Sequence, residues 1–140
     1  MKHHLSRGFT LIELMVIILI IGLLAGFVAP NVFQVGESAK IKTAGIQIKA
    51  LLVNLDRYKL DNNTFPSTEQ GLRALIEKPT TPPVPTSWAK GGYIRGKSIP
   101  KDPWTREYQY LNSNGTIFLY SQGPNKDSDD DDIGNKATQE

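Results

Sequence analysis

The chain opens its one long apolar run with Arg7-Gly8-Phe9-Thr10-Leu11-Ile12-Glu13-Leu14, and the run continues to Ala29. A short basic head, which includes Lys2, comes before Gly8. Glu13 is the lone carboxylate near the start of this apolar segment. An isolated charge in hydrocarbon costs about 2.5–3.5 kcal/mol on insertion scales, so such residues are usually paired and functional. We therefore expect Glu13 to have a partner and a role.

The apolar run has the length of a membrane-spanning helix. From Phe9 to Ala29, at about 1.5 Å per residue, a helix covers roughly 31 Å, close to the hydrocarbon thickness of a bilayer. Positive residues stay on the cytoplasmic side of a membrane, so the basic head predicts that the remainder of the chain lies on the far side. Pro30 lacks a backbone donor and is expected to kink or locally melt the helix near Gly26 to Pro30.

The next segment, 30–62, has the pattern of an amphipathic helix that continues into a soluble head. Apolar residues recur at alternating spacings of three and four, which places them on one helical face. These residues are Ile41, Ala44, Ile48, Leu51, Leu55 and Tyr58. The helix is expected to run to about Asp61 and to stop at Asn62-Asn63. Its apolar face predicts the core of a globular head.

The segment 63–140 predicts a small head of short elements. Ser67 and Gln70 have the spacing of a capping box, which would start a short helix carrying Leu72, Leu75 and Ile76. Tyr93-Ile94 is a candidate strand. Glu107 to Leu111 and Ile117 to Tyr120, separated by Asn114-Gly115, predict a β-hairpin.

Composition excludes several classes of function. The net charge of +2 comes from the basic head, because Lys2 and Arg7 account for the excess of positive residues. The sequence has no stripe of basic residues interleaved with aromatic residues, so it gives no indication of nucleic-acid binding. No set of a nucleophile, a base and an acid stands out in the sequence, so we expect that the protein is not an enzyme. The chain has 0 cysteines. Small extracytoplasmic domains often need disulfides or a metal, and without cysteines a metal becomes the expected staple.

The N-terminal residues resemble the class III signal of type IV pilins and pseudopilins. That pattern is a basic leader, Gly, Phe-Thr-Leu-x-Glu and an apolar helix. The resemblance implies that a prepilin peptidase cuts between Gly8 and Phe9, removing leader 1–8, and methylates the new N-terminus. Segment 9–29 would remain as a transmembrane and filament-core helix. The alternatives are an ordinary signal peptide, for which Ala25-Gly26-Phe27 and Ala29-Pro30 are poor cleavage sites, and a plain signal anchor.

The soluble part is similar to the major pseudopilins of type II secretion systems, the protein G family. The similar segments are Tyr58-Lys59-Leu60-Asp61-Asn62, Phe65-Pro66-Ser67-Thr68-Glu69-Gln70-Gly71-Leu72, Glu77-Lys78-Pro79, Gly92-Tyr93-Ile94, Pro100-Lys101-Asp102-Pro103-Trp104, Tyr108-Gln109-Tyr110 and Ser121-Gln122-Gly123-Pro124. The resemblance implies an α+β, type IV pilin-like fold: a long N-terminal helix, transmembrane in its first half, packed on a small antiparallel sheet with a C-terminal calcium loop.

The same resemblance implies a role and its partners. Members of this family form a homo-oligomeric helical filament in the periplasm, the pseudopilus, which drives folded proteins across the outer membrane. The implied partners are minor pseudopilins, the inner-membrane secretion platform and prepilin peptidase. The chain would be a single-pass protein of the bacterial inner membrane, with its N-terminus cytoplasmic and its head periplasmic. The alternatives are another pilin-like subunit, or a monomeric membrane-anchored calcium-binding module.

The acidic C-terminal segment resembles the calcium loop of this family. The resemblance carries Asp131 and Asp132 over as ligands, with Ser121, Gln122 and Asn125 as further oxygen donors. Calcium takes 6–8 oxygen ligands, which clustered carboxylates and carbonyls can supply. This chain departs from the pattern in having Asn125 for an aspartate, one residue fewer in the loop, and Thr105 where the family has glycine. The alternative is a solvated acidic tail.

Glu13 is expected to act in assembly. Our hypothesis is that its carboxylate pairs with the α-amino group that cleavage creates on Phe9 of a neighbouring subunit. Each charge alone would be costly to bury, and together they would set the register between subunits. The alternative is that Glu13 only extends to the membrane interface near the helix end.

Overall fold

The fold is taken from a computed structural model. It describes residues 8–96 and 98–135, apart from the side chains of 27–34. The predicted leader therefore lies outside the described residues except for Gly8. The chain separates into two compact units, Met1–Ser38 and Ala39–Glu140. The elements are helix α1 (Leu11–Asn62), the 3-10 helix η1 (Leu72–Leu75), and strands β1 (Gln109–Ser113), β2 (Thr116–Ser121) and β3 (Ile133–Asn135).

Helix α1 is continuous over 52 residues. The expected melting near Gly26 to Pro30 is wrong for this structure, because the helix is uninterrupted there. A proline removes one backbone donor, and the neighbouring hydrogen bonds suffice to keep the helical path. In the described residues, no helix combines the length and the hydropathy needed to cross a membrane. Phe9 and the large apolar residues from Leu11 to Leu24 are exposed.

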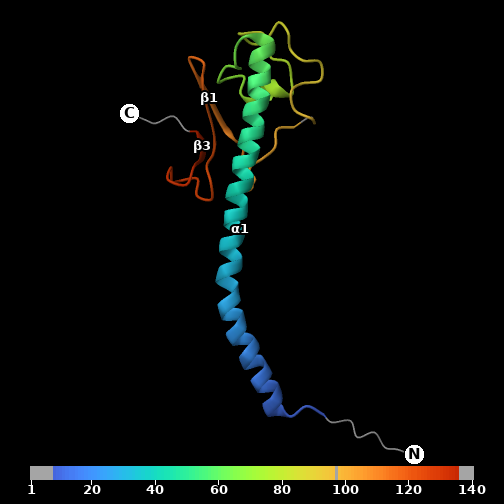
Figure 1. The fold of residues 1–140 in the computed structure, drawn as a ribbon, viewed down its shortest axis with the longest axis vertical. Helices are drawn as coiled ribbons and strands as arrows, with labels where there is room; N and C mark the ends of the chain where they lie inside the picture. Colours follow the sequence, from blue (N-terminus) through green and yellow to red (C-terminus); the bar gives the residue numbers. More distant parts are fainter. Residues whose placement is uncertain (1–7, 97, 136–140) are drawn as a thin grey trace, which may run out of the picture. The chain divides into compact units, whose positions relative to one another are not determined.

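The second unit is built on the amphipathic half of α1, as the periodicity predicts. Ala44, Ile48, Leu51, Leu55 and Tyr58 are buried, whereas Ile41 is exposed. Ile48, Leu51, Leu55 and Tyr58 pack with side chains from η1, β2 and the intervening loops: Leu72, Ala74, Leu75, Tyr93, Tyr108, Ile117 and Leu119. Figure 1 shows β1 and β3 beside this half of α1 and the yellow-green loops around its C-terminal end.

The helix ends where the two asparagines predict. Asn62 is the last residue of α1, and Asn63 follows in the left-handed region with φ 61°. The buried Asn62 amide donates to the Tyr93 hydroxyl at 2.9 Å, and its carbonyl oxygen accepts from the Ser87 backbone N–H at 3.1 Å. The helix end is therefore tied to the loop that covers it.

The sheet is antiparallel, in the order β1-β2-β3. The predicted hairpin is confirmed, and Asn114 and Gly115 have φ 51° and 89°, the left-handed pair that a tight hairpin turn requires. Strand β3 was not predicted, because Ile133 is its only apolar residue. The segment is extended because it pairs with β2. Tyr93-Ile94 is a bend rather than a strand.

The capping box forms, although it does not cap a helix. The Ser67 N–H donates to Gln70 Oε1 at 3.0 Å, and the Gln70 N–H donates to Ser67 Oγ at 3.2 Å. These bonds close a turn that precedes η1, and η1 itself is shorter than expected because it ends at Leu75, before Ile76. The predicted short helix is thus a single 3-10 turn.

Candidate functional site

A buried carboxylate organises the turn between the loops and the sheet. Asp102 is 4% exposed. Its Oδ1 accepts the backbone N–H groups of Trp104 at 3.0 Å and Arg106 at 2.7 Å. Its own N–H donates to the Arg106 carbonyl at 2.8 Å. This one side chain thus holds the Asp-Pro-Trp turn closed.

The same carboxylate connects the turn to the end of β2. Ser121, which is fully buried, donates its hydroxyl to Asp102 Oδ2 at 2.6 Å and accepts the Gly123 N–H at 3.2 Å. The Arg106 guanidinium donates to the Gly123 carbonyl. Ser121 was expected to contribute an oxygen to a metal, but its hydroxyl is already engaged with Asp102.

The acidic loop begins next to this connection, at Gly123. Gly123 has φ 61°, and a Cβ placed on it would clash with the Asp131 carbonyl oxygen. Only a residue without a side chain allows the two backbones to approach this closely. Asp131 Oδ2 accepts the Asn125 N–H at 2.7 Å. The structure therefore brings Asn125 and Asp131 together across the loop.

Asp131 carries the feature most suited to a cation. Its Oδ1 is buried and accepts no hydrogen bond within the described residues. A buried carboxylate oxygen without a donor is costly unless a positive charge compensates it. Calcium binds carboxylate and carbonyl oxygens at about 2.3–2.6 Å, so this oxygen and the adjoining Asp132 fit the expected ion.

The other predicted ligands differ in their exposure to solvent. Gln122 and Asp132 are half-buried, whereas Asn125 is exposed, and its side-chain oxygen accepts the Asp127 N–H at 3.1 Å. Across residues 8–96 and 98–135, no group of three or more Asp, Glu, His or Cys side chains could hold a metal. A cation here would therefore depend on backbone carbonyl and amide oxygens besides the two adjacent aspartates.

Tyr108 packs beside this site. Its hydroxyl donates to the Gln47 side-chain oxygen, joining the strand segment to α1. Burial, and then the negative charge of Asp102, raise the pKa of Tyr108 to about 12. The phenol therefore stays neutral and keeps donating its proton across the ordinary pH range.

The predicted processing and assembly residues lie at the start of α1. Gly8 and Phe9 precede the helix and are exposed. The Thr10 N–H and hydroxyl both lie 3.3 Å from Glu13 Oε2 and donate to it, while the Glu13 N–H donates to Thr10 Oγ1 at 3.2 Å. This is a reciprocal capping box, which satisfies two of the donors that a helix start leaves unpaired.

Sequence reasoning missed the roles of Asp102 and Thr10. The Thr-x-x-Glu spacing of Thr10 and Glu13 is a capping signal that can be read from the sequence. It was missed because the long apolar run that follows is the stronger feature of this segment. Asp102 stood within a recognised motif, but nothing in the spacing indicates that Ser121 would be its partner.

Comparison with known protein families matches two family models. The family described as type II secretion system (T2SS), protein G, matches residues 31–138. The prokaryotic N-terminal methylation motif matches residues 4–29. Together these two matches extend over nearly the whole chain.

Curated relatives and a solved structure agree with these matches. The type II secretion system core protein G of Dickeya chrysanthemi is 51% identical over 133 residues, covering 93% of this chain and 86% of that protein. That of Pseudomonas aeruginosa is 48% identical over 141 residues, covering 96% and 98%. The crystal structure of the major pseudopilin from enterohaemorrhagic Escherichia coli aligns with TM-score 0.65 and 43% identity, covering 76% of this chain and 94% of that one.

The family models, the curated relatives and the solved structure all point to the same family, and on these grounds the chain belongs to the protein G family of type II secretion systems, the major pseudopilins.

Proposed function

We propose that the chain is the structural subunit of a type II secretion pseudopilus, a periplasmic helical filament that drives the export of folded proteins. The observation that carries the proposal is the match to the protein G family over 31–138 beside the methylation motif over 4–29. The subunit would be cut by prepilin peptidase after Gly8, anchored in the inner membrane by 9–29, and assembled with the secretion platform and minor pseudopilins.

The exposed first unit supports assembly. Its apolar side chains from Leu11 to Leu24 are uncovered, and an exposed apolar surface of this extent indicates contact with lipid or with other subunits. The Glu13 carboxylate already has donors from Thr10 in the single chain. Cleavage would add a second partner, the new α-amino group on Phe9 of a neighbouring copy.

Assembly can be tested with a variant that keeps the capping box and loses the charge. Gln at the third helical position serves a capping box as Glu does, so Glu13→Gln should leave the helix start intact. We expect Glu13→Gln to be processed and inserted normally, yet to yield at least tenfold fewer sheared filaments than the wild-type chain. Filament recovery after shearing, with membrane flotation alongside, measures both.

Thr10→Val is the matched control, because it removes the cap and keeps the carboxylate. If Glu13→Gln forms filaments at the wild-type level while Thr10→Val does not, the capping role alone explains Glu13 and the intersubunit pair is wrong. Absence of any filament from the wild-type chain in a reconstituted secretion system would favour a monomeric membrane-anchored module instead.

The second part of the proposal is a calcium ion in the acidic loop. Asp131 and Asp132 would provide its charge, with carbonyl oxygens of the loop and the Gln122 or Asn125 amide completing the shell. The buried Oδ1 of Asp131 supports this assignment. The ion would fix the loop against β2 by compensating two adjacent carboxylates.

Calcium binding can be tested on the full chain in detergent. A ligand that binds only the folded state stabilises it by about 2.7 kcal/mol at a hundredfold excess over Kd. We expect calcium to raise the melting temperature relative to chelator and magnesium to raise it far less. Asp131→Asn should abolish the calcium shift, whereas the exposed Glu69→Gln should keep it. Equal melting in calcium and chelator would contradict the site.

A further inference from the structure

Strand β1 is an edge strand, and one position of its edge is already closed. Its only neighbour in the described sheet is β2. At Asn112 the Thr68 hydroxyl accepts the backbone N–H at 3.0 Å and donates to the backbone carbonyl at 3.2 Å. One side chain thus pairs with this stretch of the edge as a neighbouring strand would. Edge strands need such cover, because their unpaired N–H and C=O groups can pair with another chain.

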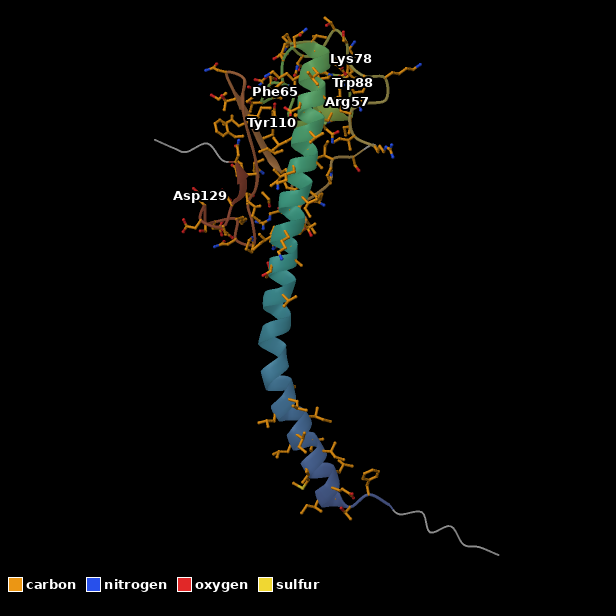
Figure 2. The ribbon with its side chains drawn as sticks, viewed as in Figure 1. Arg57, Phe65, Lys78, Trp88, Tyr110 and Asp129 are labelled. Atoms are coloured by element: carbon orange, nitrogen blue, oxygen red, sulfur yellow. The ribbon has the colours of Figure 1, made fainter. Side chains whose placement is uncertain are left out.

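Two residues earlier, the same edge is open. In an antiparallel ladder, residues that bond to the neighbouring strand alternate with residues whose N–H and C=O point away from it. Asn112 directs these groups away from β2, so Tyr110 does the same. The Tyr110 hydroxyl donates to Pro66, but within residues 8–96 and 98–135 its backbone N–H and C=O have no partner. Figure 2 labels Tyr110 where β1 runs beside α1.

A groove of about 690 Å³ adjoins this open position. Tyr110 belongs to its lining, together with Leu72 of η1 and the two half-buried isoleucines Ile76 and Ile99. The groove therefore combines a free backbone donor and acceptor with apolar surface. Added strands in other proteins use these two features, since main-chain bonds give affinity and pockets select side chains.

The charges that line the groove balance one another. Arg73 and Lys101 are positive, whereas Glu77 and Glu107 are negative, so the lining has no net charge. Arg73 and Glu77 also form an ion pair, with Nε and Oε2 2.7 Å apart. A lining of one sign would attract a charged partner, and this lining does not. The groove is therefore complementary to an uncharged segment.

Exposed segments of this chain fit the groove poorly as a contribution from a second copy. Segment 80–84 contains Pro82 and Pro83, which have no N–H to offer an edge strand. Segment 124–130 is acidic, and strand β3 has three residues of which one is apolar. A lipid has no backbone N–H and C=O pair. A different polypeptide is thus the better match.

We propose that the edge of β1 at Tyr110 captures an extended, uncharged segment of an exported protein, which adds to the sheet as a further strand. One apolar side chain of that segment would pack on Leu72, Ile76 and Ile99. The choice of partner rests on the proposed function, in which the exported protein is the polypeptide that the filament moves. The open edge is short, so the contact would be weak and readily reversed, as transport requires.

The edge contact can be tested on the full chain in detergent with the blocked peptide acetyl-Thr-Thr-Val-Thr-Thr-amide. This peptide is uncharged, favours an extended conformation and has one apolar side chain. At saturation, hydrogen exchange of the Tyr110 amide should slow by roughly tenfold, because the amide gains a partner. The Leu111 amide already bonds to β2 and should not change. Unchanged exchange at Tyr110 would overturn the proposal.

A matched pair of variants tests the apolar lining. Ile99→Asp places a charge in the groove and should abolish the peptide effect on Tyr110. Leu111→Asp is the control, because successive side chains of a strand point to opposite faces, and it should keep the effect. Melting curves show whether both variants are folded. Loss of the effect in both folded variants, or in neither, would contradict the groove as the binding surface.

A charge switch keeps the test decisive if Ile99→Asp fails to fold. The wild-type chain should bind the uncharged peptide several-fold more tightly than acetyl-Thr-Lys-Val-Lys-Thr-amide. Lys101→Glu leaves one positive and three negative side chains in the lining, so it should reverse this preference. The same preference in both proteins would show that the lining does not select the peptide.

The source of the segment is tested in a reconstituted secretion system with one exported protein of known sequence. The chain has 0 cysteines, so a photo-cross-linker can be attached at Glu107→Cys alone. It should capture the exported protein, whereas the same group at Lys90→Cys, on an exposed loop, should not. Ile99→Asp should form filaments at the wild-type level and export less.

The outcomes separate this inference from the proposed function. Capture of a second copy or of another secretion component in place of the exported protein would reject the assigned partner. Normal export by Ile99→Asp would also reject it and leave the pseudopilus assignment standing. No filaments from the wild-type chain would overturn the proposed function and the assigned partner, while hydrogen exchange at Tyr110 in detergent would still decide the edge contact by itself.

Discussion

At the scale of single residues, Thr105 has an unusual backbone conformation. It has φ 70°, in the left-handed region, although it is β-branched. A β-branched residue there is strained, whereas glycine is not. The sequence comparison anticipated a difference in this turn, since the family resemblance places glycine here. The turn keeps its shape because the Thr105 N–H donates to the Asp102 carbonyl at 2.9 Å.

Replacing Thr105 with glycine should stabilise the protein. Strain of this kind costs about 1–3 kcal/mol, and the added freedom of glycine in the unfolded chain offsets part of the gain. We expect Thr105→Gly to raise the free energy of unfolding by about 1 kcal/mol. Chemical denaturation measures the change, with Thr116→Gly on the exposed strand start as the control that should lose stability. A destabilised Thr105→Gly would mean that the turn is not strained.

At the scale of elements, Asp102 joins the turn that follows the loops to the last residue of β2. Three donors converge on its carboxylate: two backbone N–H groups and the Ser121 hydroxyl. Ser121 in turn accepts from Gly123, the residue against which Asp131 packs. The acidic loop is thus held in position by the Asp102 turn, which precedes β1 and is far from the loop in sequence.

Removing this carboxylate should loosen both the turn and the loop. Each buried donor left unsatisfied costs about 1–3 kcal/mol, so Asp102→Ala is expected to lose at least ~3 kcal/mol in unfolding free energy. Asp102→Asn retains one acceptor and should lose less. Denaturant titration measures both, and the exposed Glu107→Ala serves as the control. Equal stability of Asp102→Ala and the wild type would show that the network contributes nothing.

At the scale of the whole molecule, tyrosines join the second unit together. Burial raises the pKa of Tyr58, Tyr93, Tyr108 and Tyr110, and neighbouring groups modulate it. The Tyr110 hydroxyl donates to the Pro66 carbonyl at 2.8 Å, which fastens β1 to the loop after α1 (Figure 2). These side chains connect the helix, the loops and the sheet around one core.

The raised tyrosine pKa values predict loss of stability in alkali. A group whose pKa is higher in the folded state than in the unfolded state contributes its full stabilisation at pH values below its unfolded-state pKa, which is near 10 for tyrosine. This contribution then declines as pH rises from about 10 towards the folded value, about 12 for Tyr108. Melting temperatures measured from pH 8 to 12 should fall steeply above pH 10. Tyr108→Phe, which cannot ionise, should flatten that fall, and an unchanged slope would contradict the assignment.

The local patterns of the sequence were sufficient for several elements. The three-four periodicity from Ala44 to Tyr58 predicted the buried face of α1, and Asn62-Asn63 predicted its end. Asn114-Gly115 predicted the hairpin turn. Each signal involves residues that are close in sequence, so backbone preference and hydrophobic period alone determine the outcome. The N-terminal motif was equally local, and the family comparison agrees with it.

The tertiary structure decided the features that join distant segments. Strand β3 exists because β2 offers it a partner, and Asp102 is buried with Ser121 because the turn folds against the end of the sheet. The fold likewise decides that one carboxylate oxygen of Asp131 accepts the Asn125 N–H while the other is buried without a donor in the described part of the chain. Such pairings depend on the burial of polar groups far apart in the chain, where the lowest free energy is set by the whole core and not by any local preference.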